Sequence, residues 1–126
     1  MAIAGGRPRR SGSLERYAWF FMRVSGVMLL FIAVFHLLYM HLVIGVDNIT
    51  FDVIAERWQN PAWRLFDLLL LVFAVSHGTN GLRMVTDDLL GRGMPATVAR
   101  WAIAVFGLAL ILMGAQILFT FQAPAA

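Results

Sequence analysis

The 126-residue chain contains no cysteine and no lysine, and only 13% of its residues are charged. Without cysteine it can form no disulfide, no cysteine-based zinc site and no iron–sulfur cluster, so any metal must be held by histidine or by a cofactor. No internal repeat, nucleotide-binding loop, catalytic triad or paired-carboxylate motif is visible. The chain alone is therefore not expected to catalyse a reaction on a substrate.

Hydrophobic residues are abundant, at 60% of the chain, and the mean hydropathy is +0.77. Soluble domains contain about 45–50% apolar residues. The composition therefore predicts an integral membrane protein, and the length allows one domain at most.

Three apolar runs lie at about 17–44, 62–86 and 98–121. Each is near or above the ~20 residues that a helix needs to cross a bilayer, so the predicted fold is all-α with three transmembrane helices. Residues 1–16 are predicted to form an arginine-rich cytoplasmic arm, and residues 17–126 the three-helix membrane domain. The arm differs from a signal peptide because the apolar run after it is too long and has no small-residue cleavage site.

The arginines predict the orientation in the membrane. Eight of the ten fall on one side of the predicted spans, and only Arg57 and Arg64 fall on the other. The positive-inside rule then places the N-terminus in the cytoplasm and the C-terminus outside. This distribution indicates membrane orientation and not nucleic-acid binding.

The second run carries a stripe of His77, Gly81, Met84 and Asp88. At about 100° per residue, His77 and Asp88 are about 20° apart around the helix and about 16 Å apart along it. That spacing is too long for a shared proton but suits a large flat ligand with a neighbouring site, and Gly81 leaves room for such a ligand. Histidine commonly binds metals and haem iron. The alternative is a histidine satisfied by a neighbouring helix, with Asp88 marking the water interface.

The first run carries Arg23 and Ser25 about two turns inside its cytoplasmic end. Arg23 is expected either to extend its charge to the membrane surface or to point at an anion. His36 and His41 lie nearer the outer surface, where interfacial polar residues are the favoured interpretation over metal ligands.

Two features of the other runs predict structural roles. Arg64 and Asp67 are three residues apart, a spacing that allows a local ion pair. Gly107 and Gly114 offer small surfaces for packing the third helix, which is expected to act as a wall.

Two motifs in this order carry a resemblance to a known family. They are Arg23-Val24-Ser25-Gly26 in the first run and His77-x-x-x-Gly81-x-Arg83 in the second, with Asp88 lying 11 residues past the histidine. With three spans and an arginine arm, the chain resembles the hydrophobic membrane-anchor subunits of succinate dehydrogenase, also called succinate:quinone oxidoreductase or complex II. The resemblance covers about residues 14–90.

The resemblance implies that His77 is an axial ligand of haem b, with Gly81 beside it. It also implies that Arg23, Ser25 and Asp88 lie near a quinone or a haem propionate. The quinone, ubiquinone or menaquinone, would receive electrons from succinate oxidation through iron–sulfur clusters. The implied partners are a second, C-type membrane-anchor subunit, an iron–sulfur subunit, a flavoprotein subunit and membrane lipid.

The smaller, D-type anchor of a bacterial cytoplasmic (inner) membrane is the favoured subtype. In the family a tyrosine often follows the acid, where this chain has Leu89, and a histidine usually precedes the arginine, where this chain has Met22. Two alternatives remain: a haem b subunit of another membrane oxidoreductase, and a membrane scaffold subunit without redox function.

Overall fold

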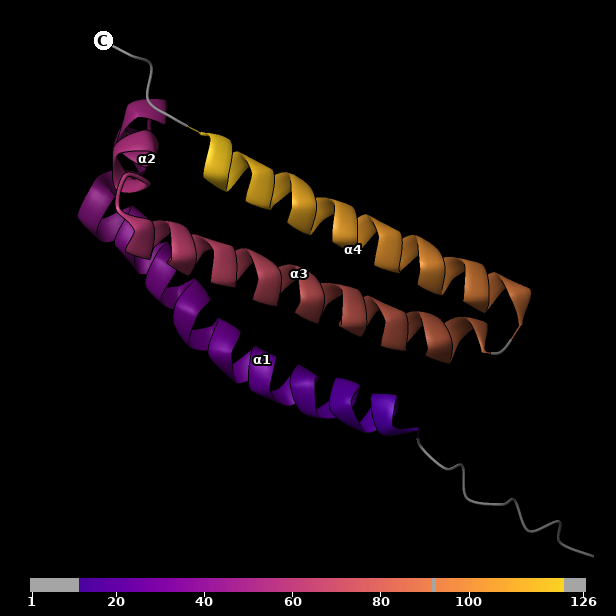
Figure 1. Cartoon of the computed structure of the whole chain (residues 1–126). Coiled ribbons are helices and arrows are strands. Elements are labelled where there is room, and N and C mark those ends of the chain that lie inside the picture. Colours follow the sequence, from indigo (N-terminus) through magenta and orange to yellow (C-terminus); the bar gives the residue numbers. More distant parts are fainter. Residues whose placement is uncertain (1–11, 92, 122–126) are drawn as a thin grey trace, which may run out of the picture.

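A computed structural model of the chain describes residues 12–91 and 93–121, and all regular structure in that part is helical. The helices are α1 (Ser13–Leu38), a π-helix (Tyr39–Gly45) and a 3-10 turn (Val46–Asn48) that continue it, α2 (Phe51–Arg57), α3 (Pro61–Leu90) and α4 (Met94–Thr120) (Figure 1). Three stretches are long and apolar enough to cross a membrane, namely Ser13–Asn48, Pro61–Leu90 and Met94–Thr120. The predicted all-α fold with three candidate spans is confirmed.

The helices extend past the apolar runs. Helix α1 begins at Ser13, so the last residues of the predicted arm are helical, whereas residues 1–11 lie outside the described part of the chain. Asp87 and Asp88 lie just past the second apolar run, which ends at about residue 86, and they belong to the last turn of α3, as the helical stripe from His77 to Asp88 requires. Hydropathy alone therefore placed the start of α1 too late and the end of α3 too early, because polar turns at a helix end stay helical outside the apolar run.

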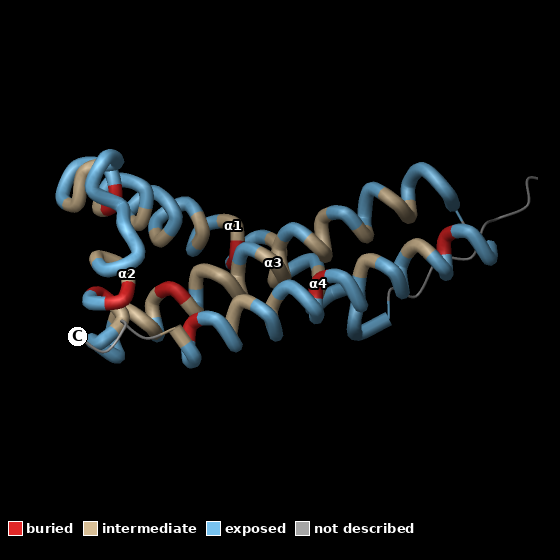
Figure 2. The backbone as a smooth tube through the Cα atoms, turned by 90° about the horizontal axis from the view of Figure 1, so that it is seen from above, coloured by how far each residue is buried: buried red, intermediate tan, exposed pale blue. Residues whose placement is uncertain are grey.

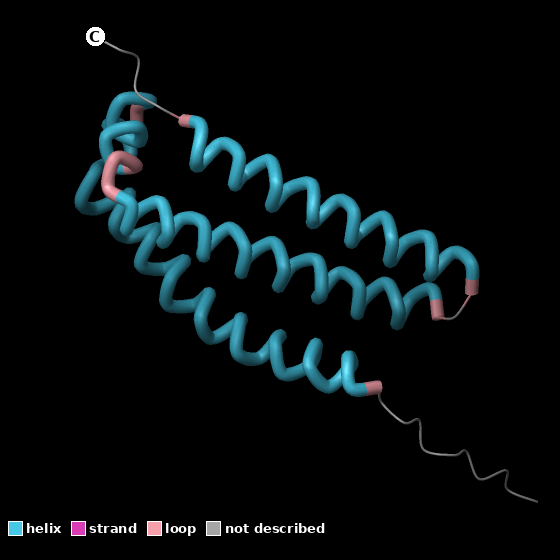
Figure 3. The backbone as a smooth tube through the Cα atoms, viewed as in Figure 1, coloured by secondary structure: helices cyan, strands magenta, loops and turns pink. Residues whose placement is uncertain are grey.

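Residues around α3 account for where it starts and stops. The side-chain oxygen of Asn60 accepts a hydrogen bond from the backbone N–H of Ala62 at 2.9 Å, and Pro61 opens the helix. Both choices are favoured at a helix N-terminus. Gly91, with a φ of 64°, ends α3 in a conformation that other residues rarely adopt. The loop segments between the described helices are short (Figure 3).

Helix α3 lies between α1 and α4 and packs against both (Figure 1). The start of α1 and the turn from α3 to α4 lie at one end of the bundle, which we call the turn end. Helix α2 and the last turn of α4 lie at the other, which we call the α2 end. The first and third spans therefore run in the same direction, antiparallel to α3.

Glycines of α4 set its distance from α3. A Cβ atom at Gly107 would overlap the side chain of Thr79, and one at Gly114 would overlap the side chain of Leu71. The predicted packing role of these glycines is confirmed, because only a residue without a side chain lets the two helices approach this closely.

Many large apolar side chains are exposed, and Figure 2 shows that exposed residues occur along the whole length of the long helices. In a membrane protein such side chains face lipid or partner helices. The described part of the chain buries few residues, and three of these are polar: Ser25, Arg57 and Asp67. Polar groups inside a bilayer are costly unless they are paired. These three residues therefore mark the places where the helices make specific polar interactions.

Candidate cofactor site

His77 lies near the middle of α3, 16 residues after Pro61 and 13 before Leu90, and its ring faces α1. Its Nδ1 lies 2.8 Å from the Oγ of Ser25, a residue with 0% exposure. The next residue on α1 is Gly26, where an added Cβ would lie 3.4 Å from the ring carbon Cε1 of His77. Ser25 and Gly26 together let the half-buried imidazole lie directly against α1.

Gly81 follows His77 on the same face of α3. A Cβ atom at Gly81 would lie 3.4 Å from the Cε of Met22, so this face also meets α1. The sequence predicted that Gly81 leaves space for a flat ligand. Within this chain, that space adjoins the end of the Met22 side chain. Because methionine is flexible, it can change rotamer and make room more readily than an aromatic ring can.

Arg23 and Asp88 lie at different levels of the bundle. Because Ser25 contacts His77 and α1 is antiparallel to α3, Arg23 is level with about residue 79 of α3. Asp88 is then about 14 Å farther toward the turn end, at 1.5 Å per residue. Arg23 is exposed and its guanidinium lies 3.9 Å from the ring centre of Trp19, while Asp88 is exposed in the last turn of α3. The structure brings Ser25 and His77 together but not Arg23 and Asp88.

An ion-pair network at the turn end was not predicted. Arg83 lies 3.3 Å from Glu15 on α1 and 3.4 Å from Asp87, and Asp87 also pairs with Arg100 of α4. The network thus links all three long helices. Its one visible sequence signal is the four-residue spacing of Arg83 and Asp87.

A groove of about 460 Å³ lies between α1 and α3 at the turn end. Its lining residues are Glu15, Arg16, Ala18, Trp19, Arg83 and Met84. The Nδ2 of Asn80 donates a hydrogen bond to the backbone oxygen of Ala18 at 3.3 Å and holds the two helices together near the groove. The groove combines an aromatic ring and a thioether with charged groups, a composition suited to an amphipathic ligand.

A second polar cluster occupies the α2 end. The carboxylate of Asp67 accepts hydrogen bonds from Arg57 and from the Nε1 of Trp58, the latter at 2.7 Å, and its other oxygen lies 3.4 Å from the Nδ1 of His36. The predicted local pair of Arg64 with Asp67 is wrong. Arg57, delivered by α2, takes that place, and the buried Nε of Arg64 has no partner among the described residues.

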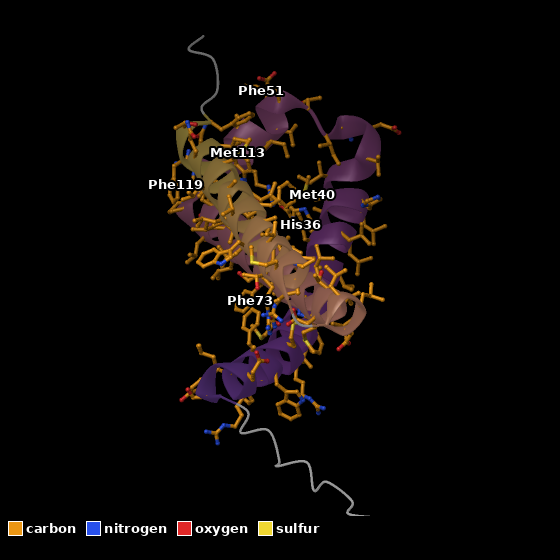
Figure 4. The ribbon with its side chains drawn as sticks, turned by 90° about the vertical axis from the view of Figure 1, so that its right-hand side faces the viewer. His36, Met40, Phe51, Phe73, Met113 and Phe119 are labelled. Carbon is orange, nitrogen blue, oxygen red and sulfur yellow. The ribbon has the colours of Figure 1, made fainter. Side chains whose placement is uncertain are left out.

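The three histidines do not converge. His36 is 11 residues from Ser25 along α1, or about 16 Å from the level of His77, and it lies with Met40 between Phe73 and Phe51 in the view of Figure 4. The Nδ1 of His41 contacts only the backbone oxygen of Leu37 on its own helix, at 2.9 Å. Within residues 12–91 and 93–121, no group of three or more histidines and acids could hold a bare metal ion. A single imidazole, by contrast, is a side chain that would hold the iron of a cofactor that brings its other ligands with it.

The fold and the site define an integral membrane subunit of three helices, with one histidine held at the centre of its bundle. The sequence model of the family described as succinate dehydrogenase/fumarate reductase transmembrane subunit matches residues 8–116. The chain therefore belongs to this family, and the resemblance stated from the motifs is confirmed.

A relative with a curated description supports this assignment. The chain is 34% identical over 77 residues to the succinate dehydrogenase hydrophobic membrane anchor subunit of Thermoplasma acidophilum. The similarity covers 61% of this chain and 60% of that relative.

Proposed function

We propose that this chain is a membrane-anchor subunit of succinate dehydrogenase and that its His77 is an axial ligand of haem b. The observation that carries the proposal is the position of the imidazole, half-buried at mid-helix on α3, with only Nδ1 bonded to the described residues. The other nitrogen, Nε2, would then be the atom that binds the iron. A bound haem supplies a one-electron carrier between the iron–sulfur clusters and the quinone pool.

The second axial ligand would come from the second anchor subunit. His36 and His41 are on the wrong part of α1, because the level of His36 is about 16 Å from that of His77. This geometry disfavours a haem b subunit that supplies both axial ligands from one chain. It suits a haem held between two anchor subunits. We assign this chain as the D-type anchor.

The quinone site of the proposal lies at the turn end, in and beside the groove. The volume of about 460 Å³ lies in the range of small-molecule sites. Arg83 lies in the groove wall beside its partners Glu15 and Asp87, and its guanidinium would donate a hydrogen bond to a quinone oxygen as negative charge develops there. Asp88, exposed in the last turn of α3, would exchange protons with water, and Arg23, about two residues from the level of His77, would place its positive charge near the quinone or a haem propionate.

The remaining redox chemistry would belong to partner subunits. This chain has no cysteine, so iron–sulfur clusters must be held elsewhere, and the flavin that oxidises succinate sits in a flavoprotein subunit. The chain would thus be a non-catalytic part of the enzyme that fixes the partners at the membrane. We place the turn end at the cytoplasmic face of a bacterial cytoplasmic membrane, as the arginines predict.

Replacing His77 by alanine in the purified complex tests the proposal. The His77→Ala variant should lose or strongly perturb the b-type absorbance in the visible spectrum, because it lacks the axial nitrogen. His41→Ala is the matched control, since His41 is exposed and its ring hydrogen-bonds, among the described residues, to the backbone oxygen of Leu37 alone, and it should keep the spectrum. Flavin content and subunit composition show that each complex is assembled. An assembled His77→Ala complex with an unchanged spectrum would contradict the assignment, and a colourless wild-type preparation without flavoprotein would favour a scaffold.

A further inference from the structure

The proton positions around Ser25 follow from its three contacts. Ser25 Oγ lies 2.6 Å from the backbone oxygen of Phe21, 3.5 Å from the backbone oxygen of Met22, and 2.8 Å from the Nδ1 of His77. A serine hydroxyl has one hydrogen to donate, while its oxygen can accept others. A carbonyl oxygen can only accept, so at 2.6 Å the hydroxyl hydrogen must lie between Ser25 and Phe21, since two oxygen atoms this close without a hydrogen repel each other.

The hydrogen between Ser25 and His77 must therefore come from the imidazole. Nδ1 carries the hydrogen and donates it to Ser25 Oγ. In a neutral imidazole only one nitrogen is protonated, so Nε2 is left with a free lone pair. The opposite tautomer would leave Nδ1 facing an oxygen without a hydrogen between them.

Burial makes this arrangement difficult to replace. Ser25 has 0% exposure and is the most completely buried polar residue of the described chain. Water cannot reach its oxygen to substitute for these partners, and a polar group left unpaired at such a site destabilises the fold. The ring also lies beside Gly26 of α1, where an added Cβ would be 3.4 Å from Cε1.

We infer that Ser25 is a positioning residue for His77: it fixes the Nδ1-protonated tautomer and the ring orientation, and so leaves Nε2 as the metal-binding atom. This rests on the proposed function for the identity of the metal group, but the tautomer itself does not. Ser25 would thus belong to the outer coordination layer of the iron, and not to the vicinity of the quinone or a haem propionate. Hydrogen bonds to the second nitrogen of a ligating histidine orient the ring and raise its basicity.

The tautomer can be measured on the full chain without haem. The chain has only 3 histidines, so ¹⁵N-histidine labelling of the protein in lipid nanodiscs gives few signals, and their loss in His77→Gln assigns those of His77. The ¹⁵N shifts should show Nδ1 protonated and Nε2 unprotonated in the wild type. In Ser25→Ala the signals should shift to a mixture or to the Nε2-protonated form. Ser76→Ala is the matched control, because Ser76 neighbours His77 and its hydroxyl bonds to none of the described residues.

The holo-complex supplies a second readout. Ser25→Ala should weaken retention of the haem by about 10–100-fold, as removal of an outer-layer partner does at metal sites. It should also raise the midpoint potential, because a less basic imidazole stabilises the oxidised iron less. Ser76→Ala should change neither quantity.

Two results would overturn the inference: an Nε2-protonated His77 in the wild-type chain, or a tautomer that stays unchanged in Ser25→Ala. Either can occur while His77→Ala still abolishes the b-type spectrum, in which case the proposed function stands and only the role of Ser25 fails. An Nδ1-protonated His77 in a protein that binds no haem would support the hydrogen-bond assignment while removing the proposed function.

Discussion

In the middle of the bundle and at its α2 end, a histidine links α1 to α3. The partner of the histidine is a neutral hydroxyl in the middle and a charged carboxylate at the α2 end. In the middle, His77 meets the neutral hydroxyl of Ser25 at 2.8 Å. At the α2 end, His36 faces Asp67, a carboxylate already engaged by Arg57 and Trp58. A neutral contact leaves an imidazole nitrogen available for a ligand, whereas a buried charge cluster fixes one arrangement of helices. Under the proposed function, the middle would serve cofactor binding, while the α2 end has a structural role.

Removing the charge of Asp67 should give the largest stability effect. Asp67→Asn leaves Arg57 buried without its counter-charge, and breaking one side of a buried pair costs about 3–5 kcal/mol. The measurement is thermal unfolding of the complex in detergent, followed by circular dichroism. The exposed acid Glu56 on α2 provides the control Glu56→Gln, which should be near neutral. An Asp67→Asn complex as stable as the wild type would show that the cluster is not structural.

Trp58 should give the next largest effect. Trp58→Phe keeps most of the aromatic surface but removes the Nε1 hydrogen bond to Asp67, and hydrogen bonds to charged groups contribute about 1.5–3 kcal/mol. Unfolding should therefore occur at a lower temperature, while the b-type spectrum stays unchanged because the contact of His77 is elsewhere. A spectral change in this variant would mean that the two regions are coupled.

The turn-end network should give the smallest effect. Its pairs of Arg83 with Glu15 and Asp87 are only partly buried, and such pairs contribute about 0.2–1 kcal/mol each. Arg83→Gln should cost about 1 kcal/mol, and most of that loss should disappear at 1 M salt, where the screening length is about 3 Å. The loss in Asp67→Asn should persist at high salt, since buried charges are screened much less. Equal salt dependence in both variants would contradict this contrast.

The three spans could be predicted from the sequence, but most of the polar contacts between the helices could not. Long apolar runs must become helices in a bilayer, so three spans could be predicted from composition. Ser25 and His77 were both singled out, but their pairing depends on the register of α1 against α3, which neither helix determines alone. The partner of Asp67 was missed because Arg57 arrives on the short α2, which has no apolar run to reveal it. The three-residue spacing along the helix therefore favoured Arg64 as the partner of Asp67, whereas in the folded chain Arg57 of α2 pairs with it.

The central claim is that the imidazole of His77 binds iron, and chemical rescue tests it most directly. In His77→Gly the space of the ring is vacated between α1 and α3, so free imidazole added to the assembled complex can occupy it. We predict that the b-type spectrum is lost in this variant and returns in a concentration-dependent manner with imidazole. A normal spectrum without imidazole would show that the iron has another ligand and would contradict the account.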